Sequence, residues 1–523
     1  MSFSKVYGAQ TNIAHASIIS IEVDLSRGFH SFSIVGLPDK AVEESKDRVC
    51  AALKNSGFLS PKSKNQKVVI SLAPADVKKE GPAFDVPMAL AYLLASDDIR
   101  FDPEKKLFLG ELSLDGEVKS MPGVLPLAME AKKRNFEEIY VPASNAREAA
   151  IVEGIAVYPV SNLTELTDHL DERKKKVDGK VACERNKIAP QPKTEIAEEG
   201  ISRSDVDLAD VHGQEGAKRA LEIAASGGHN VAMYGPPGTG KTMLARAFCG
   251  LLPPLIFEDV LEVTSIHSVA GLLSNDLVLY PPLRAPHHTA SYISIVGGGS
   301  YPKPGEITLA HKGILFMDEF PEFDRKVIDA LRQPLEDKVV TISRAKGTVT
   351  FPANVMLVVA MNPCPCGNFG NKEKECICPA GQLANYRRRI SGPIIDRIDL
   401  WTEVSVVNHK ALSEKSTGES TKDVKLRVLK ARQIQSERFK DHPRKIKLNS
   451  EMNSKDIPIF CKFTEEAKNI LNRSSEQMGL SGRSHHKIMK IARTIADLRE
   501  EEMIGTEAIL EAFQYRPRDL RTG

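Results

Sequence analysis

The segment GPPGTGKT, residues 235–242, has the spacing of a loop that binds the phosphates of a nucleotide. The apolar run NVAMY precedes it and the helix-compatible run MLARAFCG follows it, so the strand–loop–helix context of the motif is present. Glycines let backbone N–H groups point at phosphate oxygens, and the N-terminus of the next helix adds a favourable dipole. Lys241 would reach the β- and γ-phosphates, and the Thr242 hydroxyl would ligate Mg²⁺. We therefore predict that ATP and Mg²⁺ are bound by Gly235, Pro236, Pro237, Gly238, Thr239, Gly240, Lys241 and Thr242.

Polar residues that could act on the nucleotide follow two further apolar runs. KGILFMDEF, residues 312–320, is typical of a buried parallel strand followed by acids. We expect Asp318 to hold Mg²⁺ through water and Glu319 to orient and polarise the attacking water. VMLVVAMNP, residues 355–363, predicts another buried strand, followed by Asn362, whose neutral amide would hold that water against the γ-phosphate.

Two arginines complete the predicted catalytic set. Arg397 occupies a polar gap in the apolar segment SGPIIDRIDL, and Arg483 stands at the start of a predicted helix in LSGRSHHKIMKIARTIADL. Neither needs to reach the nucleotide of its own chain, because an arginine from a neighbouring subunit is a common way to gate hydrolysis by assembly. The alternative for each is a surface ion pair.

Four cysteines form a third constellation in NPCPCGNFGNKEKECICP. Cys364, Cys366, Cys376 and Cys378 lie within fifteen residues and could surround one tetrahedral Zn²⁺ ion. The C-x-C spacing is tighter than the commoner C-x-x-C, and the alternative is a loop with four reduced thiols. A zinc ion with four cysteine ligands would be structural and would hold the loop just after Asn362.

The elements that must position these residues divide the chain into four parts. Residues 1–170 are typical of a mixed α/β domain, and residues 171–204 of a charged linker. Strands alternate with helices over 205–422, which indicates a doubly wound α/β core, and 423–523 has helical apolar spacing throughout. The basic run 173–176 is either solvated or a contact to phosphates.

The composition places few limits on function. The chain has 523 residues, of which 41% are hydrophobic, and a formal net charge of +2, so any basic surface for a polyanion must be local. Eight cysteines in a chain of this length do not suggest a disulfide framework. Neither a membrane-spanning apolar run nor a secretion signal is evident, and we expect a cytoplasmic protein without a membrane partner.

The sequence resembles the ComM/YifB group of Mg-chelatase-like AAA+ ATPases over essentially its whole length. The resemblance implies an AAA+ P-loop core with a C-terminal helical lid, and a homo-hexameric ring. It also implies that Arg397 is a trans-acting arginine finger, that Arg483 is the sensor-2 arginine, and that Val211 to Gln214 border the adenine. The segments that carry it are VHGQEGAKRALEIAASGGHN, PPLRAPHHTAS, GEITLAHKGILFMDE, AMNPCPCG, SGPIIDRIDL and SGRSHHKIMKIARTIADL.

Two insertions of the core are candidates for contact with DNA. Residues 280–305 are rich in Gly, Pro, His and Ser, which predicts an exposed, mobile loop, and residues 337–353 alternate like a β-hairpin. The resemblance places both at a central pore, where cations would follow a phosphate backbone without reading sequence. The candidate contacts are Arg284, His287, His288, Arg344 and Lys346.

Two neighbouring features are weaker signals. His287 and His288 are poor candidates for a shared metal, because adjacent side chains on an extended chain point to opposite sides. The segment YRRR, residues 386–389, is either a second DNA contact or a patch at a subunit interface.

The N-terminal domain resembles the proteolytic domain of Lon in KKEGPAFDVPMALAYL and LGELSLDGEVKSMPGVLPLAMEAKK. That family needs a nucleophilic serine after Gly-Pro, but here Gly81 and Pro82 precede Ala83, and residues 126–128 contain no lysine where one is expected. A methyl group cannot attack a carbonyl, so we expect a Lon-like fold without peptidase activity, used to handle DNA or to stabilise a ring.

The leading hypothesis is a ring-forming, Mg²⁺-dependent ATPase that translocates on DNA. The resemblance implies a helicase that promotes branch migration in homologous recombination, as in natural transformation, with single-stranded or branched DNA and recombination proteins as partners. A second hypothesis is a chelatase-type motor that remodels a protein partner, which would not need cations at the hairpin tip. A third, an ATP-dependent protease, is opposed by Ala83.

Overall fold

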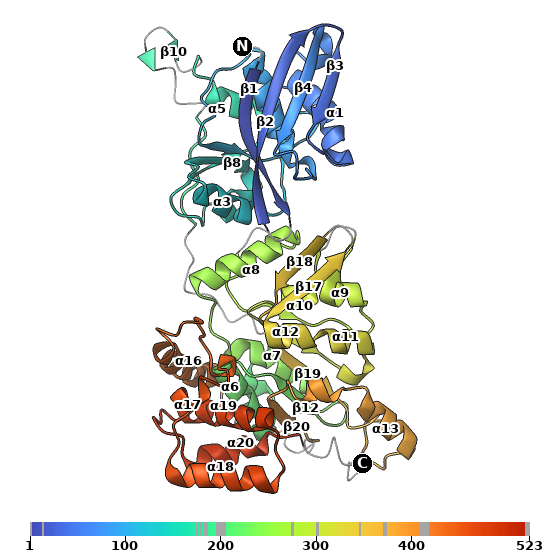
Figure 1. The fold of residues 1–523 in the computed structure, drawn as a ribbon, viewed down its shortest axis with the longest axis vertical. Coiled ribbons are helices and arrows are strands. Elements are labelled where there is room, and N and C mark those ends of the chain that lie inside the picture. Colours follow the sequence, from blue (N-terminus) through green and yellow to red (C-terminus); the bar gives the residue numbers. More distant parts are fainter. Residues whose placement is uncertain are drawn as a thin grey trace. The chain divides into compact units, whose positions relative to one another are not determined.

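The computed structural model describes residues 3–12, 15–173, 176–177, 180–181, 187–194, 206–273, 277–299, 303–344, 347–369, 374–406 and 418–517. The chain divides into two compact units. Unit 1 comprises Met1–Glu198 and Val260–Val278, and unit 2 comprises Glu199–Asp259 and Leu279–Gly523. Figure 1 shows the elements of each unit. No helix in the described part of the chain is long and apolar enough to cross a bilayer.

The main sheet of unit 1 is mixed and has seven strands. The two longest strands form an antiparallel pair, and the strands on the far side of β1 run parallel to it. In spatial order the strands are β3 (Ser31–Val35), β4 (Gln66–Ala73), β2 (His15–Arg27), β1 (Phe3–Asn12), β5 (Lys106–Phe108), β8 (Glu138–Pro142) and β9 (Ala156–Val160).

Helix α2 (Asp85–Ala95) lies in the core of unit 1 and is buried over nearly all its length. Its first residue, Asp85, is a fully buried carboxylate. Arg48 from α1 (Lys40–Asn55) donates to it over 2.7 Å, and the backbone N–H of Leu112 donates over 3.2 Å. A buried charge is stable only with such partners, so this pair fixes α2 against α1.

One helix of unit 1 comes from a later part of the chain, after the GPPGTGKT segment. Helix α8 (Phe257–Val269) begins in unit 2, but its residues from Val260 onward belong to unit 1. The Ser268 hydroxyl accepts a hydrogen bond from the backbone N–H of Gly123 over 2.9 Å and also bonds to Glu148. Helices α3 (Val124–Lys133), α4 (Ala146–Ala149) and α5 (Leu163–Leu170) complete the unit.

Unit 2 contains a five-stranded sheet in which all pairs are parallel. Its carboxyl-terminal strand ends therefore meet at one edge, where open α/β sheets bind ligands. The strand of this sheet that comes first in the sequence is β12 (Val231–Tyr234), and it lies between β19 (Met356–Met361) and β20 (Leu400–Glu403), which confirms the predicted α/β core. In spatial order the strands are β13 (Leu283–Arg284), β16 (Ile314–Met317), β19 (Met356–Met361), β12 (Val231–Tyr234) and β20 (Leu400–Glu403).

The first core insertion differs from its prediction. Residues 280–305, predicted to be an exposed loop, contain α9 (Tyr292–Val296) and the pair β14 (Gly297–Gly298) and β15 (Lys303–Pro304), followed by α10 (Glu306–Leu309). The prediction of exposure was wrong for Ile295 and Val296, whose side chains are buried, which the high content of Gly, Pro and Ser obscured; residues 291–294, just before them, are exposed as predicted.

The predicted hairpin of the second insertion is confirmed. Strands β17 (Val339–Arg344) and β18 (Gly347–Pro352) pair antiparallel, with Arg344 opposite Gly347. Figure 1 shows them beside α9 and α10, and a Cβ placed on Gly297 would lie 3.0 Å from Ile342 of β17. The two insertions are therefore packed together.

The C-terminal region is helical, as predicted, and packs on the core of unit 2. One hydrophobic cluster contains Val231 and Leu400 of the sheet together with Ile491 and Ala508 of the lid. The main lid helices are α16 (Thr421–Arg438), α18 (Glu465–Gln477), α19 (Gly482–Leu498) and α20 (Thr506–Gln514).

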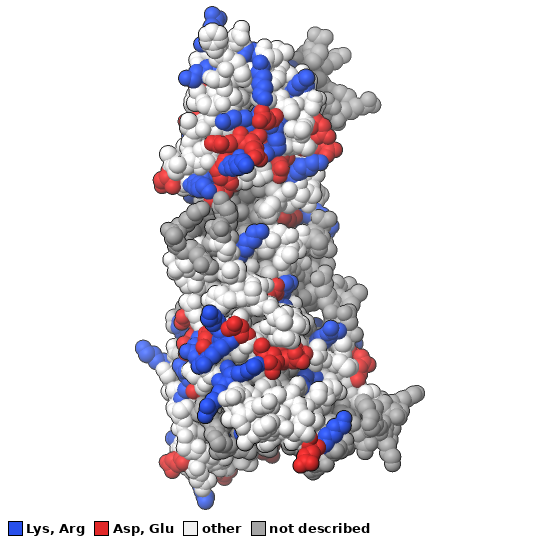
Figure 2. Space-filling model, turned by 90° about the vertical axis from the view of Figure 1, so that its right-hand side faces the viewer, with Lys and Arg blue, Asp and Glu red and all other residues white. Residues whose placement is uncertain are grey.

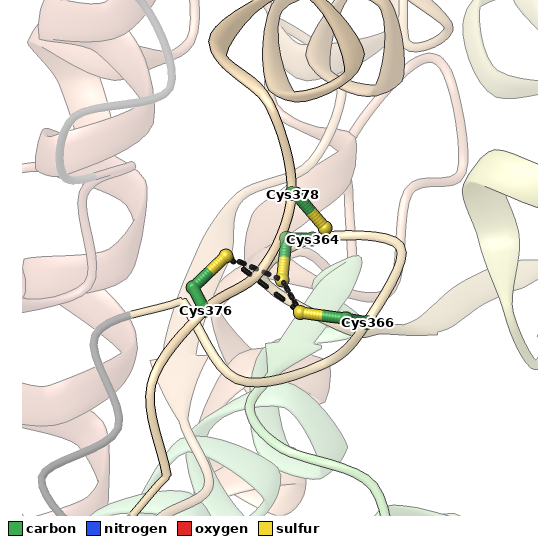
Figure 3. Close-up of side chains that lie close together, drawn as sticks. All are labelled: Cys364, Cys366, Cys376 and Cys378. Atoms are coloured by element: carbon green, nitrogen blue, oxygen red, sulfur yellow. Dashed lines mark hydrogen bonds between the residues drawn. The ribbon is translucent and has the colours of Figure 1, made fainter.

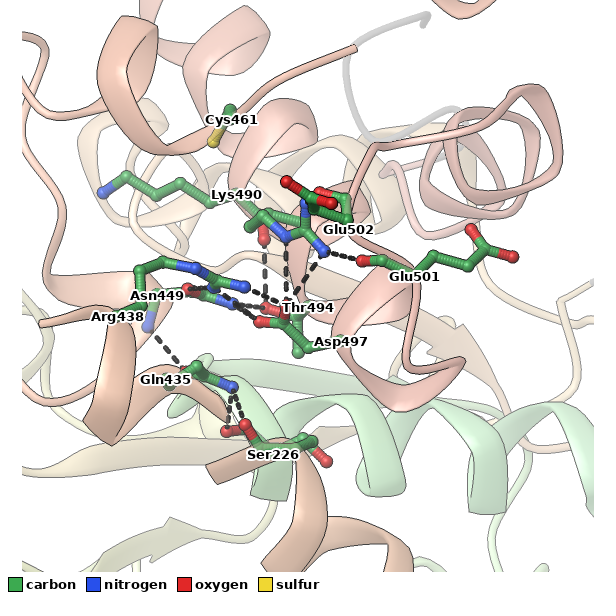
Figure 4. Close-up of polar contacts among 12 residues, drawn as sticks. Ser226, Gln435, Arg438, Asn449, Cys461, Lys490, Thr494, Asp497, Glu501 and Glu502 are labelled. Carbon is green, nitrogen blue, oxygen red and sulfur yellow. Dashed lines mark hydrogen bonds and ion pairs between the residues drawn. The ribbon is translucent and has the colours of Figure 1, made fainter. Parts of the chain in front are cut away.

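A buried polar network holds α19 in place (Figure 4). Arg493 is 1% exposed, pairs with Asp497 over 3.0 Å and donates to the carbonyl oxygen of Glu502 over 2.8 Å. Asp497 also accepts from the Asn449 amide over 2.7 Å and pairs with Arg438. Because each buried charge has partners, the helix that carries Arg483 is held rigidly.

Candidate nucleotide site

The predicted phosphate loop connects β12 to α7 (Lys241–Leu251) at the carboxyl edge of the sheet. Gly235 is required by space, since a Cβ there would lie 2.0 Å from the carbonyl oxygen of Val404. Gly238 and Gly240 are required by conformation, with φ angles of +76° and +89°. The loop therefore has the close backbone approach and curled path that phosphate binding needs.

Lys241 lies over this loop and is nearly buried. Its ammonium group donates to the carbonyl oxygens of Gly235 over 2.8 Å and Pro236 over 2.7 Å, and to Oδ1 of Asn362 over 3.2 Å. Burial lowers the pKa of Lys241, while the charges of Asp318 and Glu319 oppose the shift. A phosphate would add a further anionic partner for this charge.

The predicted metal ligands lie together. The Thr242 hydroxyl donates to Oδ2 of Asp318 over 2.8 Å, although their positions are 76 residues apart. A hydroxyl and a carboxylate offer the hard oxygen ligands that suit Mg²⁺, so the residues fit this ion. Glu319, the next residue, has a left-handed φ of 50°, and its own N–H donates to Asp318. This unusual backbone turns Glu319 away from the path of the strand.

His288, one of the DNA-contact candidates, lies against Glu319. Its Nδ1 is 3.1 Å from Oε2 of Glu319. The prediction that His287 and His288 point apart was wrong, since their ring centroids are 4.2 Å apart. The chain turns here, with the N–H of Ala290 donating to the carbonyl oxygen of His287, so the alternation of an extended strand does not apply.

Asn362 stands between the phosphate loop and α13 (Ala380–Arg388). Its side chain accepts from Lys241, and its carbonyl oxygen accepts from the Tyr386 hydroxyl over 3.2 Å. Burial raises the pKa of Tyr386, which keeps the hydroxyl protonated and able to donate. The strand end, the lysine and the tyrosine thus fix Asn362 from both sides.

The two arginines converge on one carboxylate that the sequence did not single out. Arg397 and Arg483 both form ion pairs with Oε1 of Glu336, and the Arg483 contact is 2.9 Å long. The hydrogen bond from Arg397 lowers the pKa of Glu336. Glu336 lies on α12 (Arg332–Asp337), directly before hairpin strand β17. Sequence spacing gives no signal for this cluster, because its three members come from distant segments.

The residues predicted to border the adenine lie close to the same edge. Val211 is buried in the core of unit 2. Gln214 precedes α6 (Glu215–Gly227), and its amide donates to the carbonyl oxygen of Ser405 over 2.6 Å and accepts from the Ser405 N–H over 3.2 Å. Ser405 follows β20, the neighbour of β12.

The structure describes the side chains of only some of the remaining DNA-contact candidates. Arg284 donates to both carboxylate oxygens of Glu306, over 2.6 and 2.8 Å, which indicates a structural ion pair and makes it a weak phosphate contact. His287 bonds to Thr289. The side chain of Arg344 and the whole of Lys346 lie outside the described residues.

Some described members of the two basic runs have partners within the chain. Arg173 donates to Asp171 over 3.1 Å and to the Asp97 carbonyl oxygen over 3.0 Å, so this residue is already paired within the chain, while the side chains at 174–176 lie outside the described residues. Arg389 donates to Glu322 over 2.6 Å, and the Arg387 guanidinium lies 5.1 Å from the Phe369 ring centroid. On the face in Figure 2, basic and acidic side chains are interspersed.

The Lon-like positions of unit 1 are apolar. Ala83 and two residues of α3, Leu127 and Ala128, belong to one hydrophobic cluster. The methyl group at the serine position thus belongs to the same hydrophobic cluster as residues of the helix in which the lysine was expected. An alanine methyl group at this position cannot act as the nucleophile that a serine would provide.

Comparisons with known proteins agree with this geometry. Three family models match: "Magnesium chelatase, subunit ChlI" over residues 207–412, "Subunit ChlI of Mg-chelatase" over residues 21–145, and "Magnesium chelatase, subunit ChlI C-terminal" over residues 418–516. The fold and the site therefore define a Mg-chelatase-type AAA+ ATPase.

Relatives that match this chain over nearly its whole length narrow the class of protein to one family. The chain is 40% identical to competence protein ComM of Haemophilus influenzae over 522 residues, covering 99% of this chain and 98% of that protein. It is also 40% identical to the uncharacterized protein YifB of Escherichia coli over 524 residues, with the same coverage. Lon protease 2 of Bacillus subtilis is 29% identical over 147 residues, 26% of each chain. The chain belongs to the ComM/YifB family.

Proposed function

We propose that the chain forms a homo-hexameric ring that uses ATP hydrolysis to translocate on DNA and to promote branch migration in homologous recombination, as in natural transformation. Its partners would be single-stranded or branched DNA and recombination proteins. A relative of nearly equal length is named a competence protein, which supports a role in transformation. Residues 1–170, joined by the linker 171–204, would handle DNA or stabilise the ring formed by the core (205–422) and the lid (423–523).

The arginine cluster supports assembly. Arg397 and Arg483 both bind Glu336, and among the described contacts neither bonds to Lys241, Asp318 or Glu319. A phosphate that bound these guanidinium groups would compete with Glu336 for their N–H donors. The cluster is therefore suited to completing the nucleotide site of a neighbouring chain.

The observation that carries the proposal is the covalent link between this cluster and the hairpin. Glu336 is three residues before Val339, where β17 begins. Val340, Ile342 and Phe351 are buried, so the hairpin is anchored on its inner face, and its tip carries Arg344 and Lys346. A change of partner at Glu336 would thus act directly on the base of a basic hairpin. Cations at such a tip suit a backbone of phosphates.

The residues of the site have separate tasks in this mechanism. Lys241 and the loop N–H groups bind the phosphates, while Thr242 and Asp318 would hold Mg²⁺, which neutralises charge on the transferring group. Glu319 takes the proton of the attacking water, and Asn362 orients that water. His288 restrains Glu319 through their 3.1 Å contact.

The test is the ATPase rate of the full chain with and without single-stranded DNA. The wild type is expected to be stimulated, and the double variant Arg344→Ala/Lys346→Ala to lose most of the stimulation while keeping its basal rate. The matched control is Lys468→Ala/Arg473→Ala, which removes two cations from the exposed side of lid helix α18. DNA should stimulate this variant as strongly as it stimulates the wild type.

The outcomes separate the candidate functions. Stimulation that falls steeply with salt and depends on the hairpin pair supports a DNA translocase. A wild type that hydrolyses ATP without any response to DNA would contradict the proposal and favour a motor that remodels a protein partner. Displacement of a strand from forked DNA by the same samples tests the helicase step.

A further inference from the structure

The four cysteines of the loop after Asn362 point toward one centre (Figure 3). Their sulfur atoms all lie within 4.8 Å of one another. The Sγ–Sγ distances are 3.4 Å for Cys364 and Cys366, 3.7 Å for Cys364 and Cys376, and 3.6 Å for Cys366 and Cys376. Four ligands at the Zn–S distance of about 2.3 Å lie about 3.8 Å apart at the corners of a tetrahedron. The observed spacing is therefore close to that of a zinc tetrathiolate.

The surroundings also fit a bound ion. Cys364 is fully buried, and its sulfur accepts a hydrogen bond from the backbone N–H of Phe369 over 3.3 Å. Such outer hydrogen bonds offset the negative charge that four thiolates bring to a divalent cation. Tetrahedral sulfur ligation favours zinc over ions that prefer oxygen. All four cysteines are described, although residues 370–373 of the same loop are not.

The cysteine loop touches the nucleotide site at two points. Gly367 has a left-handed φ of +78°, and a Cβ on it would lie 2.5 Å from Cδ of Pro237 in the phosphate loop. Asn362, two residues before Cys364, bonds to Lys241 over 3.2 Å. The position of the cysteine loop thus constrains both the phosphate loop and the residue that orients water.

We propose that Cys364, Cys366, Cys376 and Cys378 bind one structural Zn²⁺ ion, and that this ion holds the loop after Asn362 against Pro237 of the phosphate loop. With no open position on the metal, its role is to position Asn362 and Pro237 and not to take part in chemistry. The proposal concerns the nucleotide site alone and is independent of DNA translocation.

Metal analysis of the purified full chain tests the first part of the proposal, which is that the four cysteines bind zinc. About one zinc per chain is expected in the wild type, since four thiolates fill one tetrahedral site. Cys376→Ser/Cys378→Ser should lose most of it, and the control Cys50→Ala, a buried cysteine of unit 1, should retain it. The wild type stripped of metal should also take up one Co²⁺ per chain, with a thiolate-to-cobalt absorption band. This second measurement remains informative if a cysteine variant fails to fold.

Nucleotide binding tests the second part of the proposal, which is that the zinc-bound loop supports the phosphate loop at Pro237. The readout is the affinity for a fluorescent ATP analogue. Gly367→Ala should keep its zinc but bind nucleotide about tenfold more weakly, because the added methyl displaces Pro237 or the loop. Removal of zinc should weaken binding in the same direction, and zinc addition should restore it. A chain isolated under reducing conditions that is folded, binds nucleotide normally and takes up neither zinc nor cobalt would overturn the proposal, as would iron in place of zinc. Normal nucleotide affinity in both Gly367→Ala and the zinc-free wild type would overturn the coupling to Pro237.

Discussion

Replacing Glu336 with glutamine should raise the basal ATPase rate. In the structure this carboxylate holds both Arg397 and Arg483. If the two arginines act on a neighbouring nucleotide, they must leave Glu336 first, and the ion pairs oppose that step. Glutamine keeps the size and the hydrogen-bonding ability of the side chain but removes the charge, so the arginines are released more easily.

The magnitude follows from the exposure of the cluster. The Glu336 side chain is 44% exposed and that of Arg483 is 56% exposed, so both pairs are screened by solvent. Pairs of this kind contribute about 0.2–1 kcal/mol each, and two of them about 0.4–2 kcal/mol. At 1.36 kcal/mol for each factor of ten, the rate should rise by about 2- to 30-fold. The 11% exposure of the Arg397 side chain favours the upper part of that range.

The assay compares steady-state hydrolysis without DNA for the wild type, Glu336→Gln and Asp337→Asn. Asp337 is the next residue on α12 and has no ion pair among the described residues, so its variant removes the same charge without freeing an arginine. Oligomeric state must be measured on the same samples, because a change in assembly alone would alter the rate. A folded, normally assembled Glu336→Gln with an unchanged or lower rate would refute the competition between Glu336 and phosphate.

Three further predictions concern the nucleotide site, the carboxylate of Asp399 just before β20, and the Lon-like positions of unit 1. Glu319→Gln should keep nucleotide affinity and lower kcat by about 10²–10⁴-fold, whereas Lys241→Ala should lose nucleotide binding; equal loss of binding in both would contradict the separate roles. Burial alone would raise the pKa of Asp399, but the neighbouring His229, whose Nδ1 lies 3.6 Å from Oδ2, lowers it to about 2, from 3.8. An acid whose pKa is lower in the folded state than in the unfolded state stabilises the fold at pH values above its unfolded pKa. The melting temperature of the wild type should therefore exceed that of Asp399→Asn at neutral pH, and the difference should disappear as pH falls from about 4 toward 2. A difference that stays constant over that range would contradict the pairing of Asp399 with His229. Ala83→Ser should gain no peptidase activity on an unfolded protein substrate, since no lysine accompanies the serine, and measurable cleavage would refute the account of unit 1.

Contiguous motifs were the most predictable part of the molecule. The candidate phosphate loop and the polar residues after β16 and β19 could be located from sequence because each depends on a short strand followed at once by a candidate functional residue. Parallel pairing then brings these strand ends to one edge, as with Thr242 and Asp318. The cysteine spacing likewise placed four thiols near one another, because all lie in one loop.

Contacts between distant segments could not be predicted in this way. Glu336 meets Arg397 and Arg483 only through the packing of α12 on the lid and the core, and nothing local marks it. The pairing of His288 with Glu319 depends on a turn at residues 287–290 that the sequence did not reveal. Arg284 was a candidate for phosphate contact because it is basic, but its pairing with Glu306 requires the later helix α10.

Mixing two inactive variants tests the central claim that chains complete one another's nucleotide sites. Arg397→Ala retains its own pocket but supplies no arginine, and Glu319→Gln supplies the arginine but cannot hydrolyse. In a mixed ring of equal parts, about a quarter of the head-to-tail interfaces would join an intact pocket to an intact arginine. The account predicts that mixing and reassembly restore ATP hydrolysis to about that fraction of the wild-type rate. Mixed rings that remain as inactive as either variant alone would contradict it.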